Sequence, residues 1–375
     1  MNRRKTYHFF LMFFSGLTLA SLMLTGCDSS ESPERINIAQ ALSSGSDLGC
    51  YSIAQSPANI RLPEDSGAHE TFQTEWWYYT GNLKTKNNRL FGFQLTFFRQ
   101  ALSCKPVKKG SKWRTRQLYF AHLGLTDVSN AQFYSMHRMN RESIGIAGSQ
   151  AAPFKVWVDD WKVIQADETM RLSAFENPVA LDLLFSHFSQ PVFQGNQGLS
   201  RKGPNPSNSS YYYSIPRIKT RGEITIGTQD FEVEGFTWFD HEWSTSALSK
   251  NVSGWDWFSA HLDDGRDLMV CRIRNKKGEA NGFGFGSLSF SDGSYEILKE
   301  QDFTIHTLSK WESPVTKKKY PHKWLITLPE KGIELSVTPL VPNQEHTHSF
   351  TYWEGAARFK GDEIQGLGYI ELTGY

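Results

Sequence analysis

The sequence predicts an all-β protein built from two antiparallel β-barrel-like domains in tandem. Phe, Trp and Tyr make up 14% of the 375 residues, and 30 glycines accompany them, whereas long helical periods are few. Short alternating segments recur with turns between them, a pattern typical of barrels and sandwiches. One aromatic segment also recurs in the second half of the chain, which favours a duplicated fold.

The N-terminus has the form of a bacterial lipoprotein signal. A basic flank at residues 3–5 precedes an apolar run that ends in LTGC at Cys27, and the small residues ahead of this cysteine favour lipidation over an uncleaved membrane anchor. We therefore expect residues 1–27 to be a signal peptide with lipidated Cys27, and the Ser-rich residues 28–56 to be a tether. Acyl chains on Cys27 place the protein in the cell envelope, on the periplasmic side of the inner or outer membrane.

The segment TEWWYYTGNL (74–83) carries aromatic rings on both faces of a predicted strand. Because side chains alternate between faces, Trp76 and Tyr78 point one way and Glu75 points the other. Rings on both faces indicate a closed sheet, with a core or ligand inside and a covering layer outside. Glu75 would then orient a ligand or be the buried partner of a basic residue such as Arg272.

The segment GWDWFSAHLDDGRDLMVCRIR (254–274) repeats this pattern. Aligning Trp76 with Trp255 brings Leu83 onto Leu262. If the turn of the second segment is taken to be one residue shorter, the strands after the two turns also align, with apolar residues on one face and polar residues on the other. Each copy predicts a β-hairpin of an antiparallel sheet.

Further strands are expected between and after these hairpins. The mature part of roughly 350 residues exceeds what one core usually serves, so we expect two domains, at 57–235 and 236–375. The best helical pattern covers residues 131–142. The expected strands are 118–127, 155–164, 179–188, 221–227, 231–238, 283–290, 303–308, 323–328, 333–338, 350–359 and 366–374.

The net charge and the cysteines limit the possible partners and indicate the redox environment. The 40 basic and 39 acidic residues nearly cancel, which argues against a nucleic-acid partner. Cys50 and Cys104 are candidates for a disulfide in an oxidising compartment, whereas Cys271 lies in an apolar strand and is expected to be a buried thiol.

Residues 191–217 form a long segment rich in Gly, Pro, Asn and Ser. Loops of this length are usually functional or disordered, and the SYYYS run within it argues against disorder. The segment is therefore a lid or cavity wall, with Lys202 and tyrosines such as Tyr212 as polar contacts, or else an ordered connection between domains.

The TWFDHEWS segment (237–244) is the best candidate for chemistry. A strand directs Asp240 and Glu242 to one face and His241 and Trp243 to the other. An imidazole carries protons near neutral pH, and a carboxylic acid in an apolar pocket can stay protonated, so the cluster could act on an apolar substrate. The alternative is that His241 is structural.

No cofactor or metal is expected. The sequence has no Gly-x-Ser-x-Gly elbow, phosphate loop or GxGxxG motif. His346 and His348 have a spacing compatible with a metal, but no cysteine or carboxylate motif completes the set.

Several segments together resemble a known family, the AttH-like secreted proteins with paired lipocalin-like domains. These proteins are distantly similar to carotenoid 1,2-hydratase (hydroxyneurosporene synthase) and to fungal pericyclase-type enzymes. The resemblance spans essentially the whole mature chain, and its motifs are TEWWYYTGNL, HLGLTDV (122–128), VWVDDW (156–161), QGNQGLSRKGPNPSNSSYYYSIPR (194–217), WFDHEWS (238–244) and GLGYIELTGY (366–375).

The resemblance implies two tandem lipocalin-like antiparallel β-barrels and association with ABC transporter components. Members are also described as predicted secreted hydrolases. In the carotenoid hydratases a His-x-Trp motif and a nearby acid are thought to protonate an alkene, and His241-Glu242-Trp243 matches the first part. The strand that should carry the acid reads WDWFSAHLDDG, where Asp256 or Asp263 would each require a shifted alignment.

The sequence therefore favours a tethered lipoprotein that binds a hydrophobic small molecule or lipid, with possible transfer to an ABC exporter. The alternative is a hydratase, isomerase or hydrolase that acts on an apolar substrate through His241, Asp240 and Glu242. The residues expected to contact the ligand are Glu75, Trp76, Tyr78, Lys202, Tyr212, Trp243 and Trp257.

Overall fold

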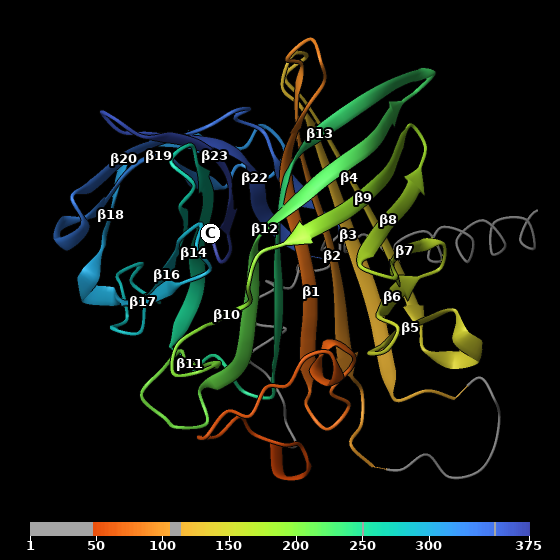
Figure 1. Ribbon diagram of the computed structural model, residues 1–375. Coiled ribbons are helices and arrows are strands. Elements are labelled where there is room, and N and C mark those ends of the chain that lie inside the picture. The colour runs from red at the N-terminus through yellow and green to blue at the C-terminus, as the bar shows by residue number, and fades with distance from the viewer. Residues whose placement is uncertain (1–47, 106–113, 250, 349) are drawn as a thin grey trace, which may run out of the picture. The chain divides into compact units, whose positions relative to one another are not determined.

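The computed structural model describes residues 48–105, 114–249, 251–348 and 350–375, and the strands of this part form two antiparallel sheets (Figure 1). The signal, Cys27 and the first part of the tether lie outside the described residues. No helix in the described ranges is long and apolar enough to cross a membrane.

The first sheet follows the order β4-β3-β2-β1-β13-β12-β9-β8-β7-β6-β5, with β10 and β11 added beside β12. Its strands are β1 (Thr74–Lys84), β2 (Leu90–Ala101), β3 (Gln117–Asp127), β4 (Gln132–Arg141), β5 (Ala147–Gln150), β6 (Lys155–Val158), β7 (Trp161–Ala166), β8 (Thr169–Glu176), β9 (Val179–Phe188), β10 (Val192–Phe193), β11 (Leu199–Arg201), β12 (Ser209–Ile226) and β13 (Gln229–Ser244).

The second sheet follows the order β17-β16-β15-β14-β23-β22-β20-β19-β18, with β21 paired to β22. Its strands are β14 (Val252–Leu262), β15 (Asp267–Asn275), β16 (Phe285–Ser289), β17 (Tyr295–Lys299), β18 (Thr304–Glu312), β19 (Lys319–Leu328), β20 (Ile333–Pro339), β21 (Glu345–Thr347), β22 (Thr351–Lys360) and β23 (Gln365–Leu372).

The topology contains the internal repeat. In both strand orders the first hairpin supplies the third and fourth strands from one edge. The first strand of each hairpin also pairs with the last strand of the same sheet: β1 with β13, and β14 with β23. Tyr78 is paired with Asp240 in the first sheet, and its counterpart Trp257 is paired with Glu371 in the second. The all-β class with two tandem barrel-like units is therefore confirmed.

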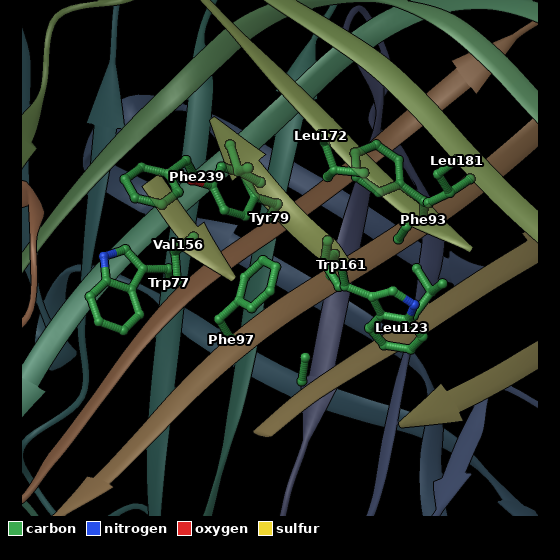
Figure 2. Close-up of a cluster of buried hydrophobic side chains, with 14 of the residues drawn as sticks. Trp77, Tyr79, Phe93, Phe97, Leu123, Val156, Trp161, Leu172, Leu181 and Phe239 are labelled. Atoms are coloured by element: carbon green, nitrogen blue, oxygen red, sulfur yellow. The ribbon is translucent and has the colours of Figure 1, made fainter. Parts of the chain in front are cut away.

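The first sheet curls into a nearly closed barrel around an apolar core. In β9 every second side chain from Val179 to Phe185 is buried, as expected for a strand with one face on a core. Trp77, Phe93 and Leu123 from one side of the sheet lie in the same cluster as Trp161 and Leu172 from the other (Figure 2). The Arg138 side chain of β4 forms ion pairs with Asp160 and Glu176, which tie the two ends of the curled sheet together.

The second sheet is a half-barrel around its own apolar cluster, in which Trp324, Trp353 and Phe359 are buried. Polar bonds join the two sheets. Asn82 Nδ2 donates a hydrogen bond to the Gly368 carbonyl at 3.0 Å. The sheets are also in close contact where Gly92 in β2 faces Ala356 in β22, because a Cβ at this glycine would lie 2.4 Å from the alanine Cβ.

Three sequence-based expectations differ from the structure. Residues 131–142 do not form a helix, because Gln132–Arg141 is strand β4, paired along its whole length with β3. The expected strand 221–227 is the end of β12, which begins at Ser209 and includes the three tyrosines. The expected domain boundary at 235/236 falls within β13, which pairs with β1 and β12 up to Ser244; the chain passes to the second sheet between Ser244 and Val252.

The cysteines lie as the sequence indicated. Cys50 and Cys104 form a disulfide that joins the segment before the first barrel to the end of β2. Cys271 in β15 is a buried free thiol.

Candidate functional site

The two faces of β13 lead to two different environments. Asp240 and Glu242 face a cavity between the two sheets, whereas His241 and Trp243 face the core of the first barrel. The alternation predicted for this strand is therefore confirmed. The three consecutive residues that were expected to act together are divided between two sites.

The cavity has a volume of ≈ 70 Å³ and is lined mainly by aromatic rings. The repeat builds its walls, because Trp76 and Tyr78 of the first hairpin lie opposite their counterparts Trp255 and Trp257 of the second. Its other lining residues are Thr96, Phe98, Lys202, Tyr212, Asp240, Glu242, Ser244, Ala247, Leu248, Cys271, Ile273, Phe285, Tyr352, Glu354 and Glu371.

Lys202, from the segment predicted to be a cavity wall, neutralises Glu242. Its Nζ lies 2.9 Å from Glu242 Oε1, and both side chains are almost fully buried. The ammonium group also lies over the rings of Phe285 and Tyr212, at 4.3 and 5.2 Å from their centroids. A buried charge needs such partners, so this pair is a fixed ionic element of the wall.

Asp240 is held by three donors. Tyr212 Oη, Ser214 Oγ and Trp238 Nε1 donate to its carboxylate at 2.8, 2.5 and 2.7 Å. Burial nevertheless raises the pKa of Asp240 to about 7, because the three hydrogen bonds only partly offset the loss of hydration. Asp240 is therefore a carboxyl group that can take up or release a proton near neutral pH.

Two further carboxyl groups, Glu354 in β22 and Glu371 in β23, line the same cavity. Burial raises the pKa of Glu371 to about 8, against one hydrogen bond from Trp255 Nε1 at 3.2 Å. Burial and the neighbouring Glu371 raise the pKa of Glu354 well above its ordinary value. Neither Glu354 oxygen forms a hydrogen bond of normal geometry among the described residues, and the nearby Tyr78 and Tyr352 hydroxyls only partly offset the effect of burial on its pKa. The protonated form of this side chain is therefore favoured.

Glu75 and His241 belong to a buried network inside the first barrel. Arg99 Nε donates to Glu75 Oε2 at 2.8 Å, and His69 Nδ1 and His241 Nε2 lie 2.7 and 2.9 Å from Glu75 Oε1. The partner of Glu75 is thus Arg99 and not Arg272, which pairs with Asp256 instead. The expectation failed because Arg272 lies in the other sheet, where it serves the corresponding hairpin.

His241 is a neutral ring held in the barrel core by Glu75, away from the cavity. Its ring is fully buried, stacks on Trp77 at a centroid distance of 4.9 Å, and contacts the tilted ring of Trp243 at 4.8 Å. Burial lowers the pKa of His241 to about 4, although the Glu75 carboxylate opposes this change. Neither His241 nor Trp243 lines the cavity.

One group of side chains among the described residues could hold a metal ion: His69, Glu75 and His241. Their potential ligand atoms lie within 4.8 Å of one another. The same atoms form the hydrogen bonds given above, and Arg99 neutralises the carboxylate. A metal would have to displace both imidazoles from Glu75 Oε1. We therefore interpret the group as a structural ionic network.

The structure brings together most of the residues expected to contact a ligand. Trp76, Tyr78, Lys202, Tyr212 and Trp257 line the cavity with Asp240 and Glu242, whereas Glu75, His241 and Trp243 lie in the barrel core. The sequence reasoning missed Glu354 and Glu371. Each lies among apolar residues of an expected strand, in TYWEGAARF and GYIELTGY, and an acid in such a position is a usable signal. Asp256, one candidate for the acid, is bound instead by Arg272 and Arg274.

Comparison with known proteins agrees with this architecture. A crystal structure of an AttH protein from Nitrosomonas europaea is 32% identical to the chain, with a TM-score of 0.77, and the match covers 86% of this chain and 99% of the other. Kievitone hydratase from Nectria haematococca shares the fold at 16% identity, with a TM-score of 0.65 and coverage of 86% and 96%. No curated protein sequence matches the chain. The family model described as AttH-like matches residues 53–375, and the chain belongs to the AttH-like family.

Proposed function

We propose that the protein binds an apolar, unsaturated small molecule in the cavity between its sheets and catalyses proton transfer to it, as a hydratase or isomerase. The observation that carries this proposal is the contrast between two carboxyl groups in one aromatic cavity. Glu354 is buried without a hydrogen-bond partner in the described chain, whereas three donors hold Asp240. Environments that separate two carboxyl groups in this way assign an acid and a base.

The chemistry follows from these two states. Glu354 gives its proton to one carbon of a double bond, and a carbocation forms at the other carbon. The ring faces of Trp76, Trp255 and Trp257 stabilise this positive charge. The oxygen of a water molecule bonds to the cation, and the Asp240 carboxylate takes the proton that this water loses. Loss of a proton from the carbon next to the cation would give an isomer instead.

The substrate class follows from the intermediate. A trisubstituted double bond of the isoprenoid type forms a tertiary carbocation, which needs the least stabilisation from the protein. The apolar walls suit a hydrocarbon chain, and the Lys202–Glu242 pair offers polar contacts for a hydroxyl or carbonyl group. The fold shared with kievitone hydratase is compatible with this chemistry, but the proposal rests on the carboxyl groups.

The test uses geranylgeraniol and a prenylated phenol as probes. Wild-type protein should incorporate ¹⁸O from labelled water, or deuterium from heavy water, into the probe, as measured by mass spectrometry. Glu354→Gln should lower this rate by about 10²–10⁴-fold while probe binding, followed by tryptophan fluorescence, stays near wild type. Glu363→Gln, at an exposed carboxylate, is the matched control. Binding without any exchange would leave a carrier protein and contradict the catalytic role.

We also propose that the protein works as a lipoprotein on the periplasmic side of the envelope, where it could exchange its hydrophobic ligand with an ABC exporter. The LTGC sequence at Cys27 and the Ser-rich residues after it support this location. A tether of this kind would let the described part reach molecules that leave the bilayer.

A further inference from the structure

Four of the 11 histidines gather where β3 and β4 of the first sheet meet β21 of the second. His122 in β3 stacks on His346 in β21 with ring centroids 5.9 Å apart, and His137 in β4 stacks on His348 at 4.4 Å. His122 and His137 are also direct neighbours across the β3–β4 ladder. The four residues, named here the histidine cluster, connect both sheets.

The inner end of the histidine cluster reaches the cavity. His122 Nδ1 lies 2.8 Å from the hydroxyl oxygen of Tyr352, a cavity residue. His346 Nε2 lies 3.9 Å from Glu354 Oε2, and its Nδ1 is 2.8 Å from Ser135 Oγ. The unpartnered acid of the cavity therefore faces a ring of the cluster.

The outer end reaches the surface. His137 is exposed and His348 is half-buried, whereas His122 and His346 are fully buried. The Nε2 atoms of His122, His346 and His348 are buried without a hydrogen-bond partner among the described residues. Such atoms are rare in folded proteins, and three of them in one cluster beside an unpartnered carboxyl group call for an explanation.

We propose that the histidine cluster is a proton path between solvent and Glu354. The path rests on the proposed function, because it supplies the acid of that reaction. After Glu354 gives its proton to the substrate, one proton enters at His137 or His348, passes through His122 and His346, and restores the Glu354 carboxylic acid. Each imidazole accepts a proton at one ring nitrogen and releases one from the other. The proton that Asp240 takes from water returns to solvent, so each turnover is balanced.

The charges around the cluster fit this role. Burial lowers the pKa of His122 to about 3 and that of His346 well below its ordinary value, so both rings are neutral at rest. A proton therefore passes only if each ring takes one up at one nitrogen and releases one from the other in the same step, without a lasting positive charge. Around the exposed ring, burial and His348 lower the pKa of His137 while Glu176 opposes them. At the inner end, the groups that face Glu354 are His346, Tyr352, Tyr78 and Glu371.

The test follows the Glu354 proton itself and needs no substrate. Infrared spectroscopy after rapid mixing with heavy water measures exchange of protonated carboxyl groups, and Glu354→Gln identifies the Glu354 band. His346→Phe and His122→Phe keep ring volume but remove the proton carrier, so they should slow exchange of this band at least about tenfold. His322→Phe changes a half-buried histidine outside the cluster and should leave exchange unchanged.

Each outcome decides the proposal. If the buried variants fail to fold, the double variant His137→Gln, His348→Gln at the outer end must still slow the exchange. Unchanged exchange in folded variants, or absence of a Glu354 band at pH 7, would overturn the path. Slowed exchange without turnover of any alkene would support the path and count against the proposed enzyme. If the protein hydrates an alkene but the histidine variants exchange the Glu354 proton at the wild-type rate, the proposed enzyme would be supported and the proton path would be refuted.

Discussion

Asp240, His241 and Glu242 are consecutive residues in three different electrostatic environments. Hydrogen bonds from Tyr212, Ser214 and Trp238 hold Asp240, whereas an ion pair with Lys202 holds Glu242. His241 lies on the opposite face of the sheet, where it forms a hydrogen bond with Glu75. Burial is nearly complete for all three, so the partners, and not exposure, decide which group exchanges a proton.

We predict that His241→Ala destabilises the protein without disabling the cavity. The change removes a hydrogen bond to Glu75 and leaves a void between Trp77 and Trp243. Together these losses should lower the free energy of unfolding by about 2–5 kcal/mol. Urea unfolding measures the loss, and fluorescence quenching by geranylgeraniol should show near wild-type affinity in the folded variant.

The opposite result would assign His241 a catalytic role. This would be the case if the His241→Ala protein kept its stability but no longer transferred protons to the probe. The His241 ring would then have to move from the barrel core into the cavity to reach the substrate. Glu242→Gln is the comparison from the same strand, because it leaves Lys202 charged in the cavity wall and should change probe affinity.

At the level of strands, the sequence predicted the hairpins and their repetition well. The Trp76–Trp255 alignment holds because both rings occupy the same place in equivalent hairpins and line one cavity. Alternation also predicted which residues of β13 share a face. It could not predict which face meets the cavity, because the outer face of the first barrel is covered by the second sheet, and this packing involves residues distant in sequence.

The failures of prediction have the same cause. Residues 131–142 show a helical period, but pairing with β3 satisfies the backbone of β4 along its whole length and overrides this period. Glu354 and Glu371 belong to the site only because β22 and β23 pack beside the first hairpin. Their local sequence marks them only as acids among the apolar residues of a strand, and the residues around His241 give no sign of them.

The disulfide is a testable feature at the same level. Cys50 and Cys104 are 54 residues apart, and their bond holds the segment before β1 against the end of β2. The double variant Cys50→Ser, Cys104→Ser should lose about 2–4 kcal/mol of the free energy of unfolding, because the open chain gains conformational entropy. Urea unfolding in oxidising buffer measures this loss. Wild-type protein in reductant should match the variant, and free thiols at both positions in native protein would contradict the prediction.

For the whole molecule, the envelope location is a further prediction. Cys27→Ser removes the sulfur that would carry the lipid, so the protein should become soluble or stay unprocessed. Cell fractionation and mass spectrometry of the N-terminal peptide measure the two outcomes. A Cys27→Ser protein that is processed normally and remains in the membrane would refute lipidation as the anchor, and Ser29→Ala is the matched control.

The carboxyl groups of the cavity should also set how stability depends on pH. The pKa values of Asp240 and Glu371 are raised to about 7 and about 8, so the folded state binds protons that the unfolded chain has already released above about pH 5. Their contribution is fully present below the unfolded pKa and is lost as pH rises through the folded pKa. His69, whose pKa is also raised, acts in the same direction, whereas neutral buried His241 destabilises only below its ordinary pKa of 6.5.

Above about pH 6.5 the carboxyl groups and His69 therefore dominate, and Tm should fall until about pH 8, the higher of the two carboxyl pKa values, and then level off. Each pKa unit crossed by a buried group corresponds to about 1.4 kcal/mol, and each kcal/mol to about 2–4 °C in Tm for a chain of this size class. Calorimetry between these pH values measures the slope. Asp240→Asn and Glu371→Gln should each flatten it, because the amide side chains do not titrate, whereas Glu363→Gln should leave it unchanged. A Tm that stays level or rises across this range would mean that Asp240 and Glu371 are already ionised at neutral pH, and their raised pKa values would be refuted.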